Sequence, residues 1–172
     1  MRVVLQRVAW ARVAVEGAEV AAIGPGLLAL VGVAREDTPE VAARLAEKAV
    51  RLRLFGDDRG SERALLETGG ELLVVSQFTL LGDVRRGNRP SWSAAAGPEE
   101  AAPVVEAFAR RAEGLGVRVG RGRFGARMAV ALENDGPVTL VLENARTGLG
   151  AASAAPSEAP SEAPDPGPNL LS

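Results

Sequence analysis

The run Leu27-Leu28-Ala29-Leu30-Val31-Gly32-Val33 decides the fold class of this 172-residue chain. It contains no polar side chain, which is typical of a strand buried on both faces of a sheet. Thr38-Pro39 follows it and predicts the start of a helix, because Thr caps helices and Pro fits their first position. A second apolar run at residues 72–75 predicts another buried strand. The core of the fold is therefore expected to be a sheet that is covered on both faces.

The remaining segments place this strand within a single layered domain over residues 1–143. Glu16-Gly17-Ala18-Glu19 is a hairpin signal, and Gly97-Pro98 precedes a second helix that we expect to stop at Gly114 or Gly116. Further strands are expected at residues 3–8, 13–15, 20–23, 117–119, 128–132 and 138–142. This order predicts an α/β fold with mixed, mainly antiparallel β-sheets and two main helices.

Residues 144–172 differ in composition from the rest and form a low-complexity tail of Pro, Ala and Ser. The unit Ala-Pro-Ser-Glu recurs within residues 155–164. Large apolar residues are too few in the tail to offset the chain entropy that folding would cost. We expect the tail to be disordered and the folded domain to end near Glu143.

The chain contains no His, no Cys and no Tyr, which limits its chemistry. A disulfide, a thiol nucleophile and a Cys-ligated zinc are excluded. An enzyme of this composition must use hydroxyls, backbone groups, carboxylates or its own substrate, and we expect no metal and no other cofactor. The formal net charge of −2 does not demand a nucleic-acid partner.

The N-terminal segment has no apolar signal-peptide region. The longest apolar stretch, Ile23 to Val33, is interrupted by Gly and Pro and is too short to span a bilayer. A cytoplasmic protein with no membrane partner is expected.

Ser76-Gln77-Phe78-Thr79 ends the second apolar run and is the first candidate site. It places two hydroxyls, an amide and a ring at the end of a strand. A Ser or Thr nucleophile needs an adjacent base. No His can serve, and Lys48 falls inside the first predicted helix. Taken alone, the segment is weak evidence for a site, because strands often end with polar residues and Phe78 also fits a place in the core.

Three other segments each allow a structural and a functional interpretation. Residues 120–125 match G-x-G-x-x-G, but a nucleotide site needs a helix after Gly125, and the pattern that follows is that of a strand. Residues 85–91 form a basic loop, which is either a solvated turn or a contact for phosphates in a non-catalytic RNA-binding module. Asn134-Asp135-Gly136-Pro137 is a turn, and only ~5–6% of X–Pro bonds in folded proteins are cis.

Taken together, five segments of the chain resemble the D-aminoacyl-tRNA deacylase family, the editing enzymes that remove D-amino acids from tRNA. The similarity extends from Met1 to about Glu143, and the chain departs from the family pattern at Trp92, where Phe is usual, and in its tail. The segments are Gln6-Arg7-Val8, Ser76-Gln77-Phe78-Thr79-Leu80, Arg86-Gly87-Asn88-Arg89-Pro90-Ser91, Gly122-Arg123-Phe124 and Asn134-Asp135-Gly136-Pro137-Val138-Thr139.

The resemblance implies a homodimer with two active sites at its interface and aminoacyl-tRNA as the substrate. Ser76, Gln77, Phe78 and Thr79 would form the catalytic segment, at which D-aminoacyl-tRNA and glycyl-tRNA are deacylated while L-aminoacyl-tRNA is rejected. The neighbouring ribose hydroxyl of the tRNA would assist hydrolysis, with Thr79 as nucleophile the alternative.

The resemblance also implies where the substrate is held. Gly136 and Pro137 of the partner subunit, joined by a cis bond, would form the chiral gate. Arg7 would orient that gate, and Phe124 and Met128 would line the pocket.

Overall fold

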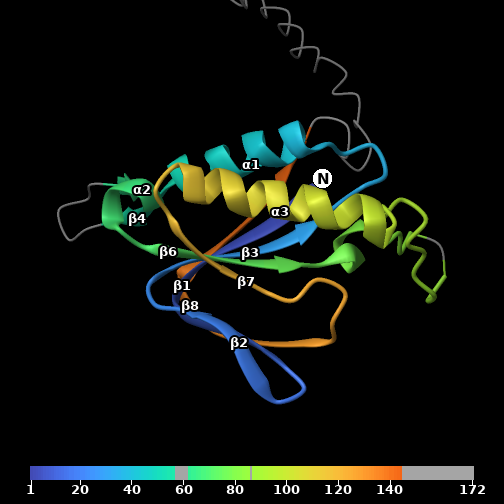
Figure 1. Cartoon of the computed structure of the whole chain (residues 1–172), viewed down its shortest axis with the longest axis horizontal. Helices are drawn as coiled ribbons and strands as arrows, with labels where there is room; N and C mark the ends of the chain where they lie inside the picture. The colour runs from blue at the N-terminus through green and yellow to red at the C-terminus, as the bar shows by residue number, and fades with distance from the viewer. Residues whose placement is uncertain (57–61, 86, 145–172) are drawn as a thin grey trace, which may run out of the picture.

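A computed structural model describes residues 1–56, 62–85 and 87–144 of the chain (Figure 1). Over these residues the main sheet has six strands in the order β2-β1-β3-β6-β7, with β8 also paired to β1. The strands are β1 (Arg2–Val15), β2 (Ala18–Ile23), β3 (Gly26–Gly32), β6 (Glu71–Ser76), β7 (Arg118–Arg121) and β8 (Met128–Glu143). A small sheet joins β4 (Arg53–Gly56) to β5 (Glu62–Ala64). The helices are α1 (Pro39–Arg51), α2 (Leu65–Thr68), the 3₁₀ helix η1 (Phe78–Leu81) and α3 (Pro98–Gly114).

The long strand β1 organises the sheet, because three other strands pair with it. One edge of β1 pairs with β8 along almost its whole length. The other edge is shared, with β3 on residues 2–8 and β2 on residues 11–15. All three pairings are antiparallel, whereas β3–β6 and β6–β7 are parallel. The sheet is therefore mixed, as the sequence predicts.

Two apolar cores lie on opposite faces of β3 and β6. Along β6, Leu72 and Val74 belong to the core beneath the helices, and Leu73 and Val75 belong to the other core. Figure 1 shows α1 and α3 side by side over one face, with β2 and the adjoining parts of β1 and β8 on the other side. This two-sided burial explains why the two strands appear in the sequence as unbroken apolar runs.

Both main helices start with the signals that the sequence carries. The Val41 N–H donates to Thr38 Oγ1 (3.4 Å) at the N-cap of α1, and Pro39 is its first residue. Helix α3 begins at Pro98 and ends at Gly114, and Gly116 then adopts a φ of +93°. Proline at the first position and a left-handed glycine after the last turn fix both ends of α3.

The α/β fold class and the two main helices are confirmed, but several boundaries differ from the prediction. Residues 3–8 and 13–15 belong to one strand, as do residues 128–132 and 138–142. Irregular pairing of β1 with β8 around Val8 explains why each strand resembles two separate ones in the sequence. The short elements α2, β4, β5 and η1 carry no sequence pattern that predicts them.

The structure decides between the two interpretations of residues 120–125. Strand β7 ends at Arg121, and β8 begins at Met128, so a strand and not a helix follows Gly125. The dinucleotide interpretation is therefore wrong. The predicted tail lies outside the described residues from Ala145 onward, so its disorder and the domain boundary near Glu143 stay predictions. Within the described ranges, no helix is long and apolar enough to cross a membrane.

A buried ion pair holds the ends of three strands together. The Met1 ammonium lies 2.5 Å from Asp37 Oδ2, and the side chains of Met1 and Asp37 are 0% and 2% exposed. The same carboxylate accepts hydrogen bonds from the Ala34 N–H (2.7 Å) and from Asn144 Nδ2 (2.7 Å). Asp37 therefore connects the start of β1 with the segments that follow β3 and β8.

Replacing Asp37 with Asn should lower the free energy of unfolding by about 3 kcal/mol, because the buried ammonium loses its counter-ion. Urea unfolding followed by circular dichroism measures the change. Glu36→Gln is the matched control, since Glu36 is exposed, and it should change stability by less than about 0.5 kcal/mol. Equal stability of the two variants would contradict this role.

Candidate active site

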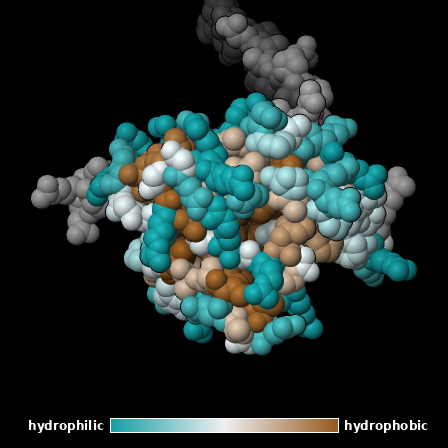
Figure 2. Space-filling model, in the orientation of Figure 1, coloured by the Kyte–Doolittle hydropathy of each residue, from teal (hydrophilic) through white to brown (hydrophobic). Residues whose placement is uncertain are grey.

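A pocket of about 580 Å³ opens at the carboxyl ends of the parallel strands β3 and β6. Val31, Val33 and Val75 form its base, and Val105 of α3 forms one wall. The loop before β8 contributes Phe124 to the lining. Figure 2 shows apolar surface gathered below the N-terminal end of α3, to the right of centre. The pocket is thus a mainly apolar cavity bordered by a few polar groups.

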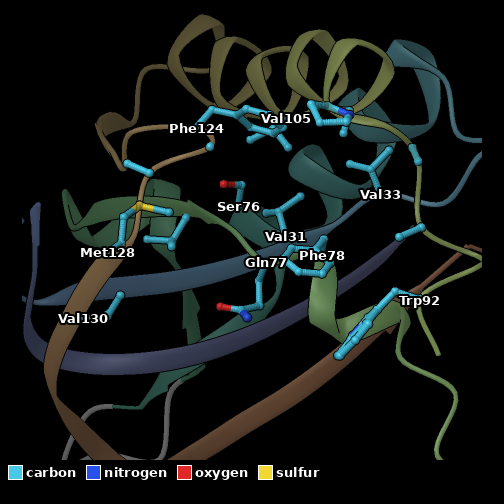
Figure 3. Close-up of a pocket in the computed structure, with 17 residues that line it drawn as sticks. Val31, Val33, Ser76, Gln77, Phe78, Trp92, Val105, Phe124, Met128 and Val130 are labelled. Atoms are coloured by element: carbon cyan, nitrogen blue, oxygen red, sulfur yellow. The ribbon is translucent and has the colours of Figure 1, made fainter. Parts of the chain in front are cut away.

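The sequence-predicted segment lies at this strand end. The Gln77 N–H donates to Val31 O (2.7 Å), which anchors the end of β6 against β3. Figure 3 shows that the Ser76 side chain points toward Phe124 and α3, whereas the Gln77 side chain points the other way. There Gln77 Nε2 donates to Thr79 Oγ1. Ser76, Gln77 and Phe78 line the pocket, and Thr79 is exposed beside it.

The 3₁₀ helix η1 starts directly after Gln77 and presents backbone N–H groups. The first N–H groups of a helix have no acceptor within the helix. Those of Phe78 and Thr79 have no hydrogen-bond acceptor among the described residues. The helix is held by Leu80 N–H to Gln77 O (3.2 Å) and by Gly82 N–H to Thr79 O (3.0 Å). Two fixed donors therefore lie beside the pocket.

None of the 17 residues that line the pocket carries an ionisable side chain. Two ionisable residues, Glu106 and Arg121, border a smaller cavity that shares Ser76 with the pocket. Burial opposes the ionised form of Glu106, but hydrogen bonds from Arg110 (2.8 Å) and Arg121 (3.2 Å) outweigh it and keep the pKa of Glu106 below its ordinary value. Such a carboxylate is a weak base at neutral pH.

The predicted residues Arg7, Gly136 and Pro137 form a separate unit. Val8 pairs with Asn134 and Gln6 with Thr139, so residues 135–138 bulge out of β8 opposite Arg7. Arg7 Nε donates to Asp135 O (3.2 Å) and pairs with Asp135 Oδ2 (3.0 Å). Gly136 has a φ of +120°, and a side chain there would collide with the Arg7 guanidinium. Arg7 therefore shapes the bulge.

The Gly136–Pro137 bond is trans, because the described residues contain no cis peptide bond. The prediction of a cis bond is wrong. A trans X–Pro bond is the more stable isomer by about 0.5–1 kcal/mol. Asn134 Nδ2 donates to Arg7 O (2.8 Å) and Val138 O (3.2 Å), and these bonds close the bulge with Gly136 at positive φ. The turn is thus satisfied without the cis isomer.

A single chain does not bring the bulge to the pocket. Arg7 is level with Leu27 of β3, whereas Ser76 is level with Val31. Four strand positions separate the two levels, which is about 13 Å along the sheet. The bulge and the Ser76–Thr79 segment therefore lie toward opposite ends of the strands.

Several of the pocket residues are not predicted from the sequence. Phe124 and Met128, which the resemblance implies as pocket residues, are among the residues that line this cavity, and their role toward a substrate stays a prediction. Trp92 and Val105 line the cavity as well. Trp92 lies outside the helices and strands, and Val105 is part of an ordinary helical apolar pattern, so the sequence does not mark either as a pocket residue. Only the packing of α3 over the strand ends makes Val105 a pocket residue.

Comparison with known proteins identifies close relatives. The family described as D-Tyr-tRNA(Tyr) deacylase matches residues 4–143. A D-aminoacyl-tRNA deacylase of Roseiflexus castenholzii (strain DSM 13941 / HLO8) is 59% identical over 146 residues, which cover 84% of this chain and 93% of that protein. The protein of the same name from Desulforudis audaxviator (strain MP104C) is 52% identical over 145 residues, which cover 84% and 97%.

Solved structures share the fold. The c-Myc DNA unwinding element binding protein superposes with a TM-score of 0.77 at 37% identity, covering 84% of this chain and 99% of its own. A probable eukaryotic D-amino acid tRNA deacylase superposes with a TM-score of 0.73, covering 82% and 97%. Its 18% identity makes it a guide to the fold alone.

Proposed function

The chain belongs to the D-aminoacyl-tRNA deacylase family, and from this premise we propose that it hydrolyses the ester joining a D-amino acid to the terminal ribose of tRNA. The observation that carries the proposal is the apolar pocket at the end of β6, with the η1 N–H donors beside it. An adenosine and an ester group fit such a cavity, since apolar walls hold the base and fixed donors face the carbonyl.

The proposed reaction needs no base from the protein. Water attacks the ester carbonyl, the neighbouring ribose hydroxyl assists the proton transfer, and the bond from carbonyl carbon to ribose oxygen breaks. The products are the free D-amino acid and tRNA with its terminal hydroxyl restored. The N–H groups of Phe78 and Thr79 stabilise the negative charge that develops on the carbonyl oxygen. This route agrees with a pocket lining that has no ionisable side chain.

Thr79 acts in this scheme as a positioning group. Its hydroxyl accepts a hydrogen bond from Gln77 Nε2, and an amide cannot remove a proton from it. A nucleophilic hydroxyl would need a base within hydrogen-bond reach. The local geometry therefore supports backbone donors and substrate assistance over a covalent intermediate on Thr79.

Thr79→Ala should lower kcat by no more than about tenfold, the effect of one lost hydrogen bond, whereas loss of a nucleophile costs 10³-fold or more. Single-turnover deacylation of D-Tyr-tRNA measures kcat, and mass spectrometry after acid quench searches for an acylated protein. Thr79→Ser is the control that keeps the hydroxyl. An acyl group trapped on Thr79 would restore the nucleophile hypothesis.

We further propose that the site is completed by a second copy of the chain. Leu140 and Val141 of β8 are 36% and 57% exposed, and within the described part of the chain β8 pairs only with β1. An open strand edge with large apolar side chains favours association with another chain. The exposed part of β8 is therefore the proposed dimer surface.

A two-fold axis near Leu140 would bring the two halves of the site together. Leu140 lies midway between Pro137 and Glu143 along β8. Glu143 pairs with Arg2, which also donates to Leu80 O of η1 (2.6 Å). Rotation about Leu140 exchanges the two ends of this stretch, so the bulge of one copy would approach η1 of the other. Such a contact is isologous, as in most homodimers.

Val141→Glu should convert the dimer to a monomer of 17.8 kDa, because two carboxylates would face each other across the axis. Light scattering measures the mass. Deacylation should fall at least about tenfold, since each pocket loses part of its boundary. Ala129→Glu, at an exposed position of the same strand, is the control. A fully active monomer would contradict the shared site.

The bulge supplies a physical basis for chiral selection in this arrangement. Residues 135–138 of the partner subunit would form a rigid obstacle where an L side chain must lie, while a D side chain points away from it. Rejection by an obstacle discriminates without favouring any one D-amino acid. Glycine has no side chain to meet the obstacle, so glycyl-tRNA should also be accepted.

Three matched substrates test the activity. D-Tyr-tRNA should be deacylated rapidly, glycyl-tRNA measurably, and L-Tyr-tRNA at least about 100-fold more slowly than the D-form. Release of radiolabelled amino acid measures all three rates. Equal rates on both enantiomers would contradict the proposal that the bulge acts as an obstacle to L side chains. Binding of tRNA without hydrolysis of any ester would instead support a non-catalytic RNA-binding module.

A further inference from the structure

The Phe78 ring stands at the mouth of the pocket with little support from its own element. It is 59% exposed, although it is the first residue of η1. Its aromatic neighbour is Trp92, at a centroid distance of 6.0 Å and an interplanar angle of 64°. This edge-on arrangement is favourable for aromatic pairs. Figure 3 shows both rings on the side of the pocket opposite Phe124.

Trp92 is itself held in place by the backbone around it. Asp83 and Ser91 exchange two backbone hydrogen bonds of 2.7 and 3.0 Å, which bring the segments before and after the basic loop together. The Ala95 N–H donates to Trp92 O (3.0 Å). Gly82 leaves room for the indole, since a side chain there would lie 3.3 Å from Trp92 Nε1. These contacts therefore define the position of the Trp92 indole.

We propose that Trp92 is a positioning residue that holds the Phe78 ring where the terminal nucleoside of the substrate binds. The inference rests on the proposed function. The exposed side of Phe78 would leave its ring free to rotate, and the contact with the Trp92 indole restricts that rotation. A ring fixed before binding loses less entropy when a base stacks on it, so Trp92 tightens substrate binding. The reacting carbonyl faces the η1 backbone, which Trp92 does not hold.

This role predicts an effect on KM and not on kcat. Trp92→Leu keeps apolar bulk without a ring and should raise KM for D-Tyr-tRNA about fivefold, the size of one aromatic edge contact, with kcat within about twofold. Trp92→Phe should restore KM to within about twofold. The ratio of D to L rates should stay unchanged in both variants, because the bulge sets it.

Trp10→Leu is the matched control. Trp10 is 38% exposed and Trp92 is 43% exposed, but Trp10 lies in β1 and does not line the pocket. Its replacement should leave KM and kcat unchanged. Melting temperatures of all variants should agree within a few degrees, because neither indole belongs to the two buried cores.

A double-mutant cycle separates positioning from a direct role of the indole. If Trp92 acts through Phe78, then Trp92→Leu should have no further effect on KM in a Phe78→Leu background. Additive effects of the two substitutions would overturn the proposal. An unchanged KM in Trp92→Leu, or a KM raised equally by Trp92→Phe, would overturn it too.

Fluorescence gives a readout that needs no hydrolysis. The chain contains two Trp and no Tyr, so Trp10→Phe leaves Trp92 as the only indole. A non-hydrolysable amide analogue of D-alanyl-adenosine should change its emission on saturation, and Phe78→Leu should weaken the binding of that analogue. Emission that stays constant while the analogue binds would contradict the proposal. Failure of the wild type to hydrolyse any D-aminoacyl-tRNA would defeat the proposed function, whereas normal hydrolysis with unchanged Trp92 variants would defeat this inference alone.

Discussion

Burial of β3 and β6 on both faces is the constraint on which the rest of the structure depends. Leu72 and Leu73 point into different cores, so neither face of these strands is open to a ligand. A ligand can reach the strands only where they end, and in parallel sheets the carboxyl ends are the usual place. Ser76 is the residue at which β6 leaves the sheet, and η1 starts two residues later. The same packing that stabilises the domain therefore determines where its polar backbone groups become accessible.

The distribution of charge around the pocket follows from this constraint. Glu106 and Arg121 border the smaller cavity next to Ser76, where Arg121 pairs with Glu113 (2.5 Å) and Glu106 (3.2 Å) and fixes β7 against α3. The hydrogen bonds that Arg121 donates to Glu113 and Glu106 raise the pKa of Arg121, so its charge is permanent. These groups hold the wall that carries Phe124 in place, and they are too strongly paired to exchange protons with a substrate. In the proposed mechanism, catalysis in such a site is therefore left to backbone dipoles and to the substrate.

The sequence predicts the buried strands and helix starts well, because each depends on local chemistry. The apolar run before Ser76 predicts a buried strand, and the pair Thr38-Pro39 predicts the start of a helix. Each prediction depends on only a few neighbouring residues. The places where prediction fails depend on distant contacts. Strand β1 looks like two strands because of irregular pairing near Val8, and Trp92 lines the pocket beside Phe78 although it lies outside the helices and strands. The isomer at Pro137 is the clearest case, since Asn134 and the positive φ of Gly136 close the turn without a cis bond.

The two halves of the proposed site are fixed by one strand. Arg2 of β1 holds η1 through Leu80 O, and Arg7 of the same strand holds the bulge through Asp135 O. Arg7 also donates to Leu54 O, which ties the bulge to β4 as well. The spacing of bulge and η1 within a chain is therefore the spacing of two residues on a rigid strand. In a two-fold dimer the same spacing would occur twice, once in each copy, so the fit of bulge to pocket would depend on strand geometry and not on loops. Sites built on strands hold their geometry more accurately than sites built on loops, and selection between mirror-image substituents on one carbon requires that accuracy.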